Sequence, residues 1–213
     1  MELLIATYET IKMTVIALFF SYLIGLPIGI LANETSKFGL IPCKPVNFVL
    51  EILIGAGRAI PFTILMVLVL PLTRLLIGTG VGTAATIVPL TIAAIPFVAR
   101  TVANSLDLVD VDMVKAAKID NASKLKIAFK IKLFSRMFDI LSSMGLTSVA
   151  IISYTAISGM LGGGGLGNYA ITKGYYQYEW LCVLWATLII IGIVCLFQWF
   201  FSFISKLVDW RKK

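Results

Sequence analysis

Five long stretches of apolar side chains restrict this sequence more than any other feature. Each stretch is about 20 residues long and carries no more than one charged residue. A helix rises about 1.5 Å per residue and the hydrocarbon core of a bilayer is about 30 Å thick, so a stretch of this length can cross a membrane. We therefore predict five membrane-spanning helices over residues 13–32, 52–73, 81–103, 140–161 and 180–205.

The composition agrees with an all-helical membrane protein. Of the 213 residues, 59% are hydrophobic and only 14% are charged, whereas about 25% of the residues of a soluble domain are charged. The chain therefore lacks the polar surface that would keep it in solution. We predict a single all-α, polytopic membrane domain over residues 1–213.

The positive charges are distributed unevenly between the two sides of these spans. If the amino terminus lies outside, the outer segments hold only Lys12, Arg74 and Lys173 of the 18 lysine and arginine residues. The other 15, among them Arg58 and the basic residues 211–213, then face the cytoplasm. Because basic residues collect on the cytoplasmic side of membrane proteins, we expect an outer amino terminus and an inner carboxyl terminus. The first span lacks the basic segment that begins a signal peptide, so we expect it to be retained.

The sequence gives no sign of an enzyme active site. It contains no histidine, which excludes histidine catalysis and histidine metal ligands. Cys43, Cys182 and Cys195 are widely spaced, which argues against a zinc site or a disulfide framework. No G-x-x-x-x-G-K-[ST] phosphate motif and no basic-aromatic platform for nucleic acid occurs. We predict no catalytic residues, no metal site and no nucleic-acid partner.

The energy source for this chain is expected to lie elsewhere. A gradient-driven carrier usually places ionisable groups in the middle of its spans, and no acidic residue occupies such a position here. A carrier acting alone is therefore the less favoured alternative, and a separate energising chain is the preferred one.

The largest polar segment, residues 107–139, is rich in lysine, and we call it the basic loop. Asp110 and Asp112 suit the start of a helix, because an aspartate side chain accepts hydrogen bonds from the first free N–H groups. Asn121 is expected to end that helix, since asparagine readily takes the left-handed conformation of a helix end. Ser123 can then cap a second helix. The basic loop is therefore predicted to be a helix-turn-helix on the cytoplasmic side.

The second predicted helix of the basic loop has one apolar face. Its apolar stripe consists of Ile127, Ala128, Ile131 and Phe134. The lysines lie mostly off that stripe: Lys124, Lys126, Lys130 and Lys132. Such a helix suits either an anionic lipid surface or a cytoplasmic protein partner. The narrow face formed by the two alanines 116–117 favours the partner.

The basic loop resembles the EAA loop of ABC-importer permeases. In that pattern, E-A-A is followed after three residues by glycine, and about nine residues later by an ending of the hydrophobic-x-L-P type. Lys115-Ala116-Ala117 stands at the E-A-A, Asn121 at the glycine, and residues 131–134 at the ending. In this family the loop forms coupling helices that sit in a cleft of the ATPase subunit. The resemblance implies a coupling role for Asp112, Lys115, Ala116, Ala117, Asn121 and Ser123.

Nearly the whole chain is similar to the permease subunits of methionine-type ABC importers. The matching stretches are RAIPFTIL (58–65), VPLTIAAIPFVAR (88–100), YTAISG (154–159) and GGGGLG (162–167). The resemblance implies a multi-pass protein of the bacterial inner membrane that pairs with a second copy, two ATPase subunits and an extracytoplasmic substrate-binding lipoprotein. It implies import of an amino acid, with methionine expected first and another amino acid as the alternative. ATP and magnesium would be bound by the ATPase, and this chain would need no cofactor.

Three residues depart from the EAA pattern. Lys115 reverses the charge of the family's glutamate, and Asn121 replaces a glycine in a turn that asparagine tolerates. Phe134 replaces a proline and cannot break a helix as proline does. We predict that the partner ATPase carries an acidic residue opposite Lys115. The alternative is a transporter with weakened coupling.

Small and hydroxyl-bearing residues crowd the fourth predicted span. Such residues let membrane helices approach closely and bond to one another, so ordinary packing would explain them. The resemblance adds a second interpretation, in which this span lines the pathway or the interface between two copies. The candidates for that role are Ser142, Ser143, Ser148, Thr155 and Gly159.

The glycines after this span, at 162–165 and 167, cannot continue a stable helix. We expect them to form an outer loop that ends the span. A flexible loop at this place would suit contact with a substrate-binding protein, and a plain connection is the alternative.

Overall fold

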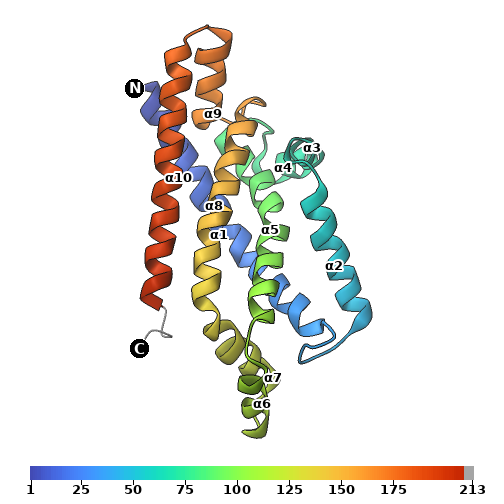
Figure 1. Cartoon of the computed structure of the whole chain (residues 1–213). Helices are drawn as coiled ribbons and strands as arrows, with labels where there is room; N and C mark the ends of the chain where they lie inside the picture. The colour runs from blue at the N-terminus through green and yellow to red at the C-terminus, as the bar shows by residue number, and fades with distance from the viewer. Residues whose placement is uncertain (209–213) are drawn as a thin grey trace.

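A computed structural model describes residues 1–208, so the basic residues 211–213 lie outside the described residues. Four long helices run between the two ends of the molecule (Figure 1): α1 (Glu2–Thr35), α5 (Thr83–Asp107), α8 (Met137–Gly159) and α10 (Trp180–Val208). In the described part of the chain, four helices are long and apolar enough to cross a membrane, and a bent pair could make a fifth. The all-α membrane class is therefore confirmed.

The two ends of the bundle differ. The lower end in Figure 1 carries the basic loop, with α6 (Val111–Ile119), α7 (Lys124–Lys126) and the π-helix η1 (Ile127–Leu133), and we call it the basic-loop end. Four short helices lie toward the other end: α3 (Phe62–Leu68), α4 (Leu70–Ile77), α9 (Gly165–Tyr169) and the π-helix η2 (Ala170–Tyr176).

The second predicted span, residues 52–73, is not one helix. Instead α2 runs from Lys44 to Ala59, and the chain then bends by 108° into α3. Pro61 lies at the bend, and a proline disfavours helical conformation in the residue before it; Ile60 is accordingly extended. Hydropathy alone could not locate this bend, because the apolar side chains continue through it.

The early start of α2 changes the place of one basic residue. Pro45 occupies the first turn of α2, where a missing N–H does no harm, so the helix begins before the apolar stretch does. Arg58 therefore lies at the α3 end of α2 and not at the basic-loop end, where the expected topology had placed it. Midway along the same helix, Glu51 accepts a hydrogen bond of 3.3 Å from Arg100 of α5.

The helix α1 begins well before its apolar stretch, already at Glu2. Its early polar residues have partners on the segment after α8. Glu2 forms an ion pair of 3.3 Å with Lys173, and a Glu9 carboxylate oxygen accepts a hydrogen bond of 2.8 Å from the Gly165 N–H. These contacts stabilise the start of α1 where hydropathy gives no signal.

The glycine-rich stretch after α8 is held against two other helices. Gly162, Gly164 and Gly165 all have positive φ, which favours glycine. The Leu166 N–H donates to the Thr10 hydroxyl of α1 at 2.9 Å, and the Thr86 hydroxyl of α5 donates to the Gly163 carbonyl at 3.3 Å. The contacts therefore favour a fixed connection over the flexible loop that the sequence left open.

The core is built where α1 crosses α5 and α8. A Cβ atom on Gly29 would lie 2.5 Å from the Ala99 carbonyl oxygen, so the absence of a side chain lets α1 and α5 approach closely. Met13, Leu90 and Ile151, one from each of these helices, are fully buried in one apolar cluster. This crossing ties the end of α1 to the end of α5 at the basic-loop end.

Candidate functional site

The first helix of the basic loop begins as its aspartates predict. The Asp110 carboxylate accepts a hydrogen bond of 2.9 Å from the Asp112 N–H, so Asp110 is the N-cap of α6. Asp112 lies in the first turn and forms an ion pair of 2.9 Å with Lys115, three residues later. Both side chains are exposed, so this pair contributes little to stability and leaves Lys115 accessible to a partner.

The turn after α6 is the predicted asparagine turn. Asn121 has a φ of 54°, and its N–H donates to the Lys118 carbonyl at 3.1 Å. The Ala122 N–H donates to the Ala117 carbonyl at 3.1 Å, which completes a Schellman motif. The Ser123 hydroxyl then accepts from the Lys126 N–H at 3.3 Å and caps α7. Both helix-end predictions are confirmed.

The predicted apolar stripe of the second helix is only partly present. Ile127 and Ala128 are buried, but Phe134 is 59% exposed. The reason is that α7 passes into the π-helix η1, in which bonds run from residue i to i+5. The residue five places after Ile127 is Lys132, and its side chain is buried. The expectation that Lys132 lies off the buried face is wrong.

A groove of about 420 Å³ lies between α6 and η1. One wall is a single face of α6, formed by Met113, Ala116, Ala117 and Asp120. The other side is formed mainly by Ala122, Lys126, Lys130, Ile131, Phe134 and Ser135. The groove is thus mainly apolar, with two alanines on one wall and two lysines on the other. It suits a protein surface that offers an apolar projection with acidic neighbours.

Lys115 does not line this groove. With Lys118 it lines a smaller hollow of about 280 Å³ on the neighbouring face of α6, opposite Asn33 and Asp107. The structure therefore brings Ala116 and Ala117 together with Phe134, and it separates them from the charge-reversed position. A partner that fills the groove would meet Lys115 only at the side of α6.

Four of the five small residues predicted to line the pathway or an interface are buried within this chain. The hydroxyls of Ser143, Ser148 and Thr155 donate to carbonyls of their own helix at 2.6, 2.7 and 2.7 Å. Gly159 lies directly against α9. Only Ser142 of the five is exposed. Packing inside the subunit, the alternative left open by the sequence, explains the four buried residues.

A hydroxyl cluster joins α1 to α8 and can be tested directly. The Tyr22 hydroxyl lies 2.9 Å from the Ser143 hydroxyl and 3.2 Å from that of Thr147. We expect Tyr22→Phe to lower the free energy of unfolding by about 0.6 kcal/mol, the average for such bonds between membrane helices. Denaturant titration in detergent measures this, with Tyr8→Phe on the exposed side of α1 as the control. Equal effects of the two changes would contradict the prediction.

Comparison with known proteins assigns the chain to a family. The model of the family described as "Binding-protein-dependent transport system inner membrane component" matches residues 25–213. The chain belongs to this family. It is therefore an inner-membrane component of a transport system that depends on a binding protein.

Individual members of the family are similar over nearly the full length. The "Methionine import system permease protein MetP" of Bacillus subtilis is 39% identical over 210 residues, which cover 99% of this chain and 95% of MetP. The "Probable D-methionine transport system permease protein MetI" of Pasteurella multocida is 42% identical over 208 residues, covering 97% and 95%.

Solved structures give the same result for the fold. A chain of the MetNI methionine ABC transporter, in an inward-facing conformation, matches with a TM-score of 0.95 and 31% identity, covering 98% of this chain and 97% of that one. A chain of an amino acid ABC transporter crystallised with histidines matches with a TM-score of 0.69 and 21% identity, which supports the fold alone.

One contact of the basic loop, that of Lys132 with the end of α1, was not expected from the sequence. Lys132 contacts Asn33 and Glu34 at the end of α1, but the first predicted span stopped before these residues. The signal was the run Asn33-Glu34-Thr35 directly after an apolar stretch, because polar side chains at that place need partners.

Proposed function

We propose that this chain is the permease subunit of an ATP-driven importer of methionine. The observation that carries the proposal is the near full-length match to a chain of the MetNI methionine ABC transporter. The relatives named for methionine transport in Bacillus and Pasteurella support the same substrate. Two copies of the chain pair with two ATPase subunits and receive methionine from an extracytoplasmic binding protein. A permease for another amino acid is the second candidate.

The amino terminus lies outside in this proposal, and the basic-loop end lies in the cytoplasm. The exposed lysines of α6, α7 and η1 support this orientation, because basic residues collect on the cytoplasmic side. Arg58 no longer counts toward it, but the basic loop by itself still carries seven of the 18 lysine and arginine residues.

The groove between α6 and η1 is where the ATPase docks. Ala116 and Ala117 give one wall with little side-chain volume, and the exposed Phe134 offers an apolar contact. Asn121 and Ser123 fix the turn between α6 and α7, and Asp112 pairs with Lys115 in the first turn of α6, so these three residues shape the groove rather than contact the partner themselves. The ATPase binds ATP and magnesium, while this chain holds no cofactor and moves between outward-facing and inward-facing states.

Reconstitution tests this function. The chain is reconstituted in liposomes with its ATPase facing the lumen. ATP is enclosed in the lumen, and the binding protein supplies labelled methionine from outside. We expect uptake that requires all three proteins and ATP. Uptake driven by an ion gradient without the ATPase would instead identify a carrier. If another amino acid inhibits the uptake of labelled methionine at a lower concentration than unlabelled methionine does, the second candidate is identified.

The charge at Lys115 gives a prediction about the partner. We expect Lys115→Glu to lower ATP-dependent uptake by about tenfold, since a carboxylate there would face Asp112 and the predicted acidic residue of the ATPase. Uptake in the reconstituted transporter measures it, with Lys124→Glu, exposed on the same loop, as the control. A large gain in uptake would contradict an acidic partner and favour weakened coupling.

A further inference from the structure

One lysine of the basic loop differs from the rest in its surroundings. The Lys132 side chain is 9% exposed, and that of its partner Glu34 is 7% exposed, whereas Lys124, Lys126 and Lys130 are exposed. Removing two charges from water is unfavourable unless they are paired and further hydrogen-bonded. The surroundings of Lys132 meet both conditions.

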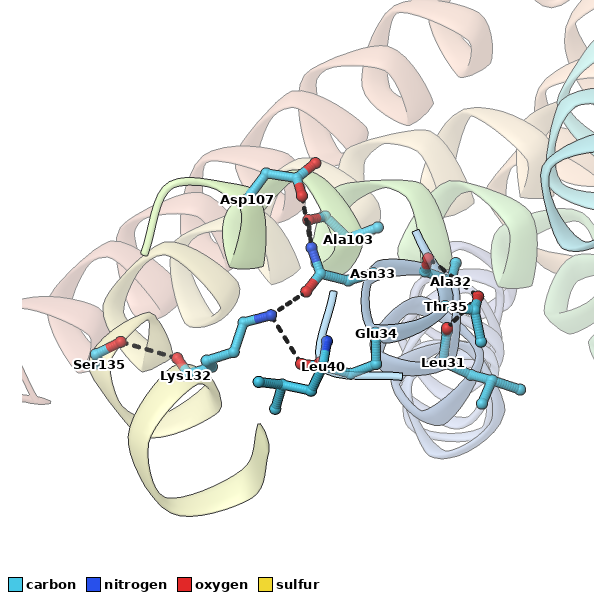
Figure 2. A network of polar contacts seen from close by, with 10 residues as sticks. All are labelled: Leu31, Ala32, Asn33, Glu34, Thr35, Leu40, Ala103, Asp107, Lys132 and Ser135. Carbon is cyan, nitrogen blue, oxygen red and sulfur yellow. Dashed lines mark hydrogen bonds and ion pairs between the residues drawn. The ribbon is translucent and has the colours of Figure 1, made fainter. Parts of the chain in front are cut away.

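Figure 2 shows Lys132 between two acceptors at the end of α1. Its Nζ donates to Glu34 Oε1 at 2.7 Å and also to Asn33 Oδ1. The second carboxylate oxygen of Glu34 accepts from the Leu40 N–H at 3.0 Å. The ion pair is therefore anchored on one side to the connection that follows α1.

Asn33 extends the contact from α1 to α5 (Figure 2). Its amide nitrogen donates to Asp107 Oδ1 at 2.6 Å and to the Ala103 carbonyl at 3.3 Å. The amide oxygen faces the lysine and the amide nitrogen faces the carboxylate, so each end of the side chain meets its complementary charge. One connected network thus joins the basic loop, the end of α1 and the end of α5.

The position of Lys132 depends on the π-helix. The backbone of η1 continues directly from α7 and lies beside α6, and the i to i+5 spacing turns Lys132 inward, toward α1. An α-helical course would instead give Ile131 the place nearest to Ile127. The unusual helix therefore orients the one side chain of the loop that forms a buried ion pair among the described residues.

We propose that Lys132 is a positioning residue that clamps the basic loop to α1 and α5. Displacement of α6 and η1 is then passed to the ends of both helices through a buried ion pair and an amide bridge. Because α1 and α5 approach each other closely near these ends, at Gly25 and Gly29 of α1, the two helices move with the loop as one body. This inference rests on the proposed function, in which an ATPase displaces the loop.

The double variant Lys132→Met with Glu34→Gln tests the clamp in the reconstituted transporter. It removes both charges together, so no buried charge is left unpaired, and the glutamine amide oxygen introduced at position 34 can still accept from the Leu40 N–H. We expect ATP hydrolysis within about twofold of wild type, and methionine imported per ATP hydrolysed lower by at least about fivefold. The matched control is Lys124→Met on the same loop, with an unchanged ratio.

A second readout does not depend on transport. Hydrogen exchange of the amides in residues 127–133 is measured in the permease–ATPase complex, and we expect at least about tenfold faster exchange in the double variant, with α8 unaffected. A purely structural role would reduce ATP hydrolysis and import together and leave their ratio unchanged.

The outcomes separate the two proposals. If wild type shows no ATP-dependent uptake, the proposed function fails, and exchange in residues 127–133 of the purified permease still tests the clamp. If wild type imports methionine and the folded double variant has the same import per ATP, the clamp is overturned while the function stands. Wild-type exchange rates in residues 127–133 of the double variant would overturn the clamp as well.

Discussion

Gly159→Ala is expected to destabilise the folded permease strongly. A Cβ atom at this position would lie 2.2 Å from the Asn168 backbone nitrogen and 2.5 Å from the Gly167 carbonyl carbon. Backbone atoms of a packed helix cannot turn aside as a side chain can, so α9 would have to separate from α8. We expect a loss of about 3 kcal/mol, a large part of the roughly 5–15 kcal/mol that stabilises a typical domain.

The contact is reciprocal, which makes relief by a small shift difficult. A Cβ atom on Gly167 would lie 2.4 Å from the Ala156 carbonyl oxygen. The start of α9 is also bonded to α1, through the N–H groups of Gly165 and Leu166. A displacement of α9 would therefore break these bonds as well.

Yield and thermal unfolding of the purified protein in detergent measure the effect. The matched control is Gly192→Ala in α10, because a Cβ atom there meets nothing within 4 Å and alanine is the better helix former. We expect the control to equal or exceed wild type in stability. A monodisperse Gly159→Ala protein that unfolds at the wild-type temperature would show that α8 and α9 are not in close contact.

The local features of the fold could be predicted from neighbouring residues. The cap at Asp110, the left-handed turn at Asn121 and the cap at Ser123 each depend on a few adjacent backbone groups. The same holds for the long apolar helices, since length and hydropathy decide whether a segment can cross a bilayer. The membrane class and the helix-turn-helix of the basic loop therefore followed from the sequence.

The features that the sequence could not give depend on distant contacts. The bend at Pro61 lies inside an apolar stretch, and Lys132 becomes a buried residue only because a π-helix turns it toward Glu34, far away in the chain. Gly159 was a candidate for an interface, but its neighbour is α9 of the same chain. A small residue allows close packing without indicating which surface approaches it.

The second large effect is expected for Ala116→Phe, which should lower ATP-dependent uptake by at least about tenfold. Ala116 is exposed on the α6 wall of the groove, so a phenyl ring would fill the groove without disturbing the packing of the permease. The ATPase surface that we propose to occupy this groove would then be excluded. The neighbouring Ala117 is buried, and a large side chain there would disturb α6 itself.

Exclusion from the groove can be distinguished from a change in the helix. Ile119→Phe is the matched control, because Ile119 lies on the same helix, is 79% exposed and does not line the groove. Uptake in proteoliposomes and co-purification with the ATPase are measured for both variants. We expect Ala116→Phe to lose both uptake and the bound ATPase while unfolding at the wild-type temperature, and Ile119→Phe to keep both. If Ala116→Phe still imports methionine at the wild-type rate, the ATPase does not dock between α6 and η1, since a filled groove leaves no room for a projection from the partner.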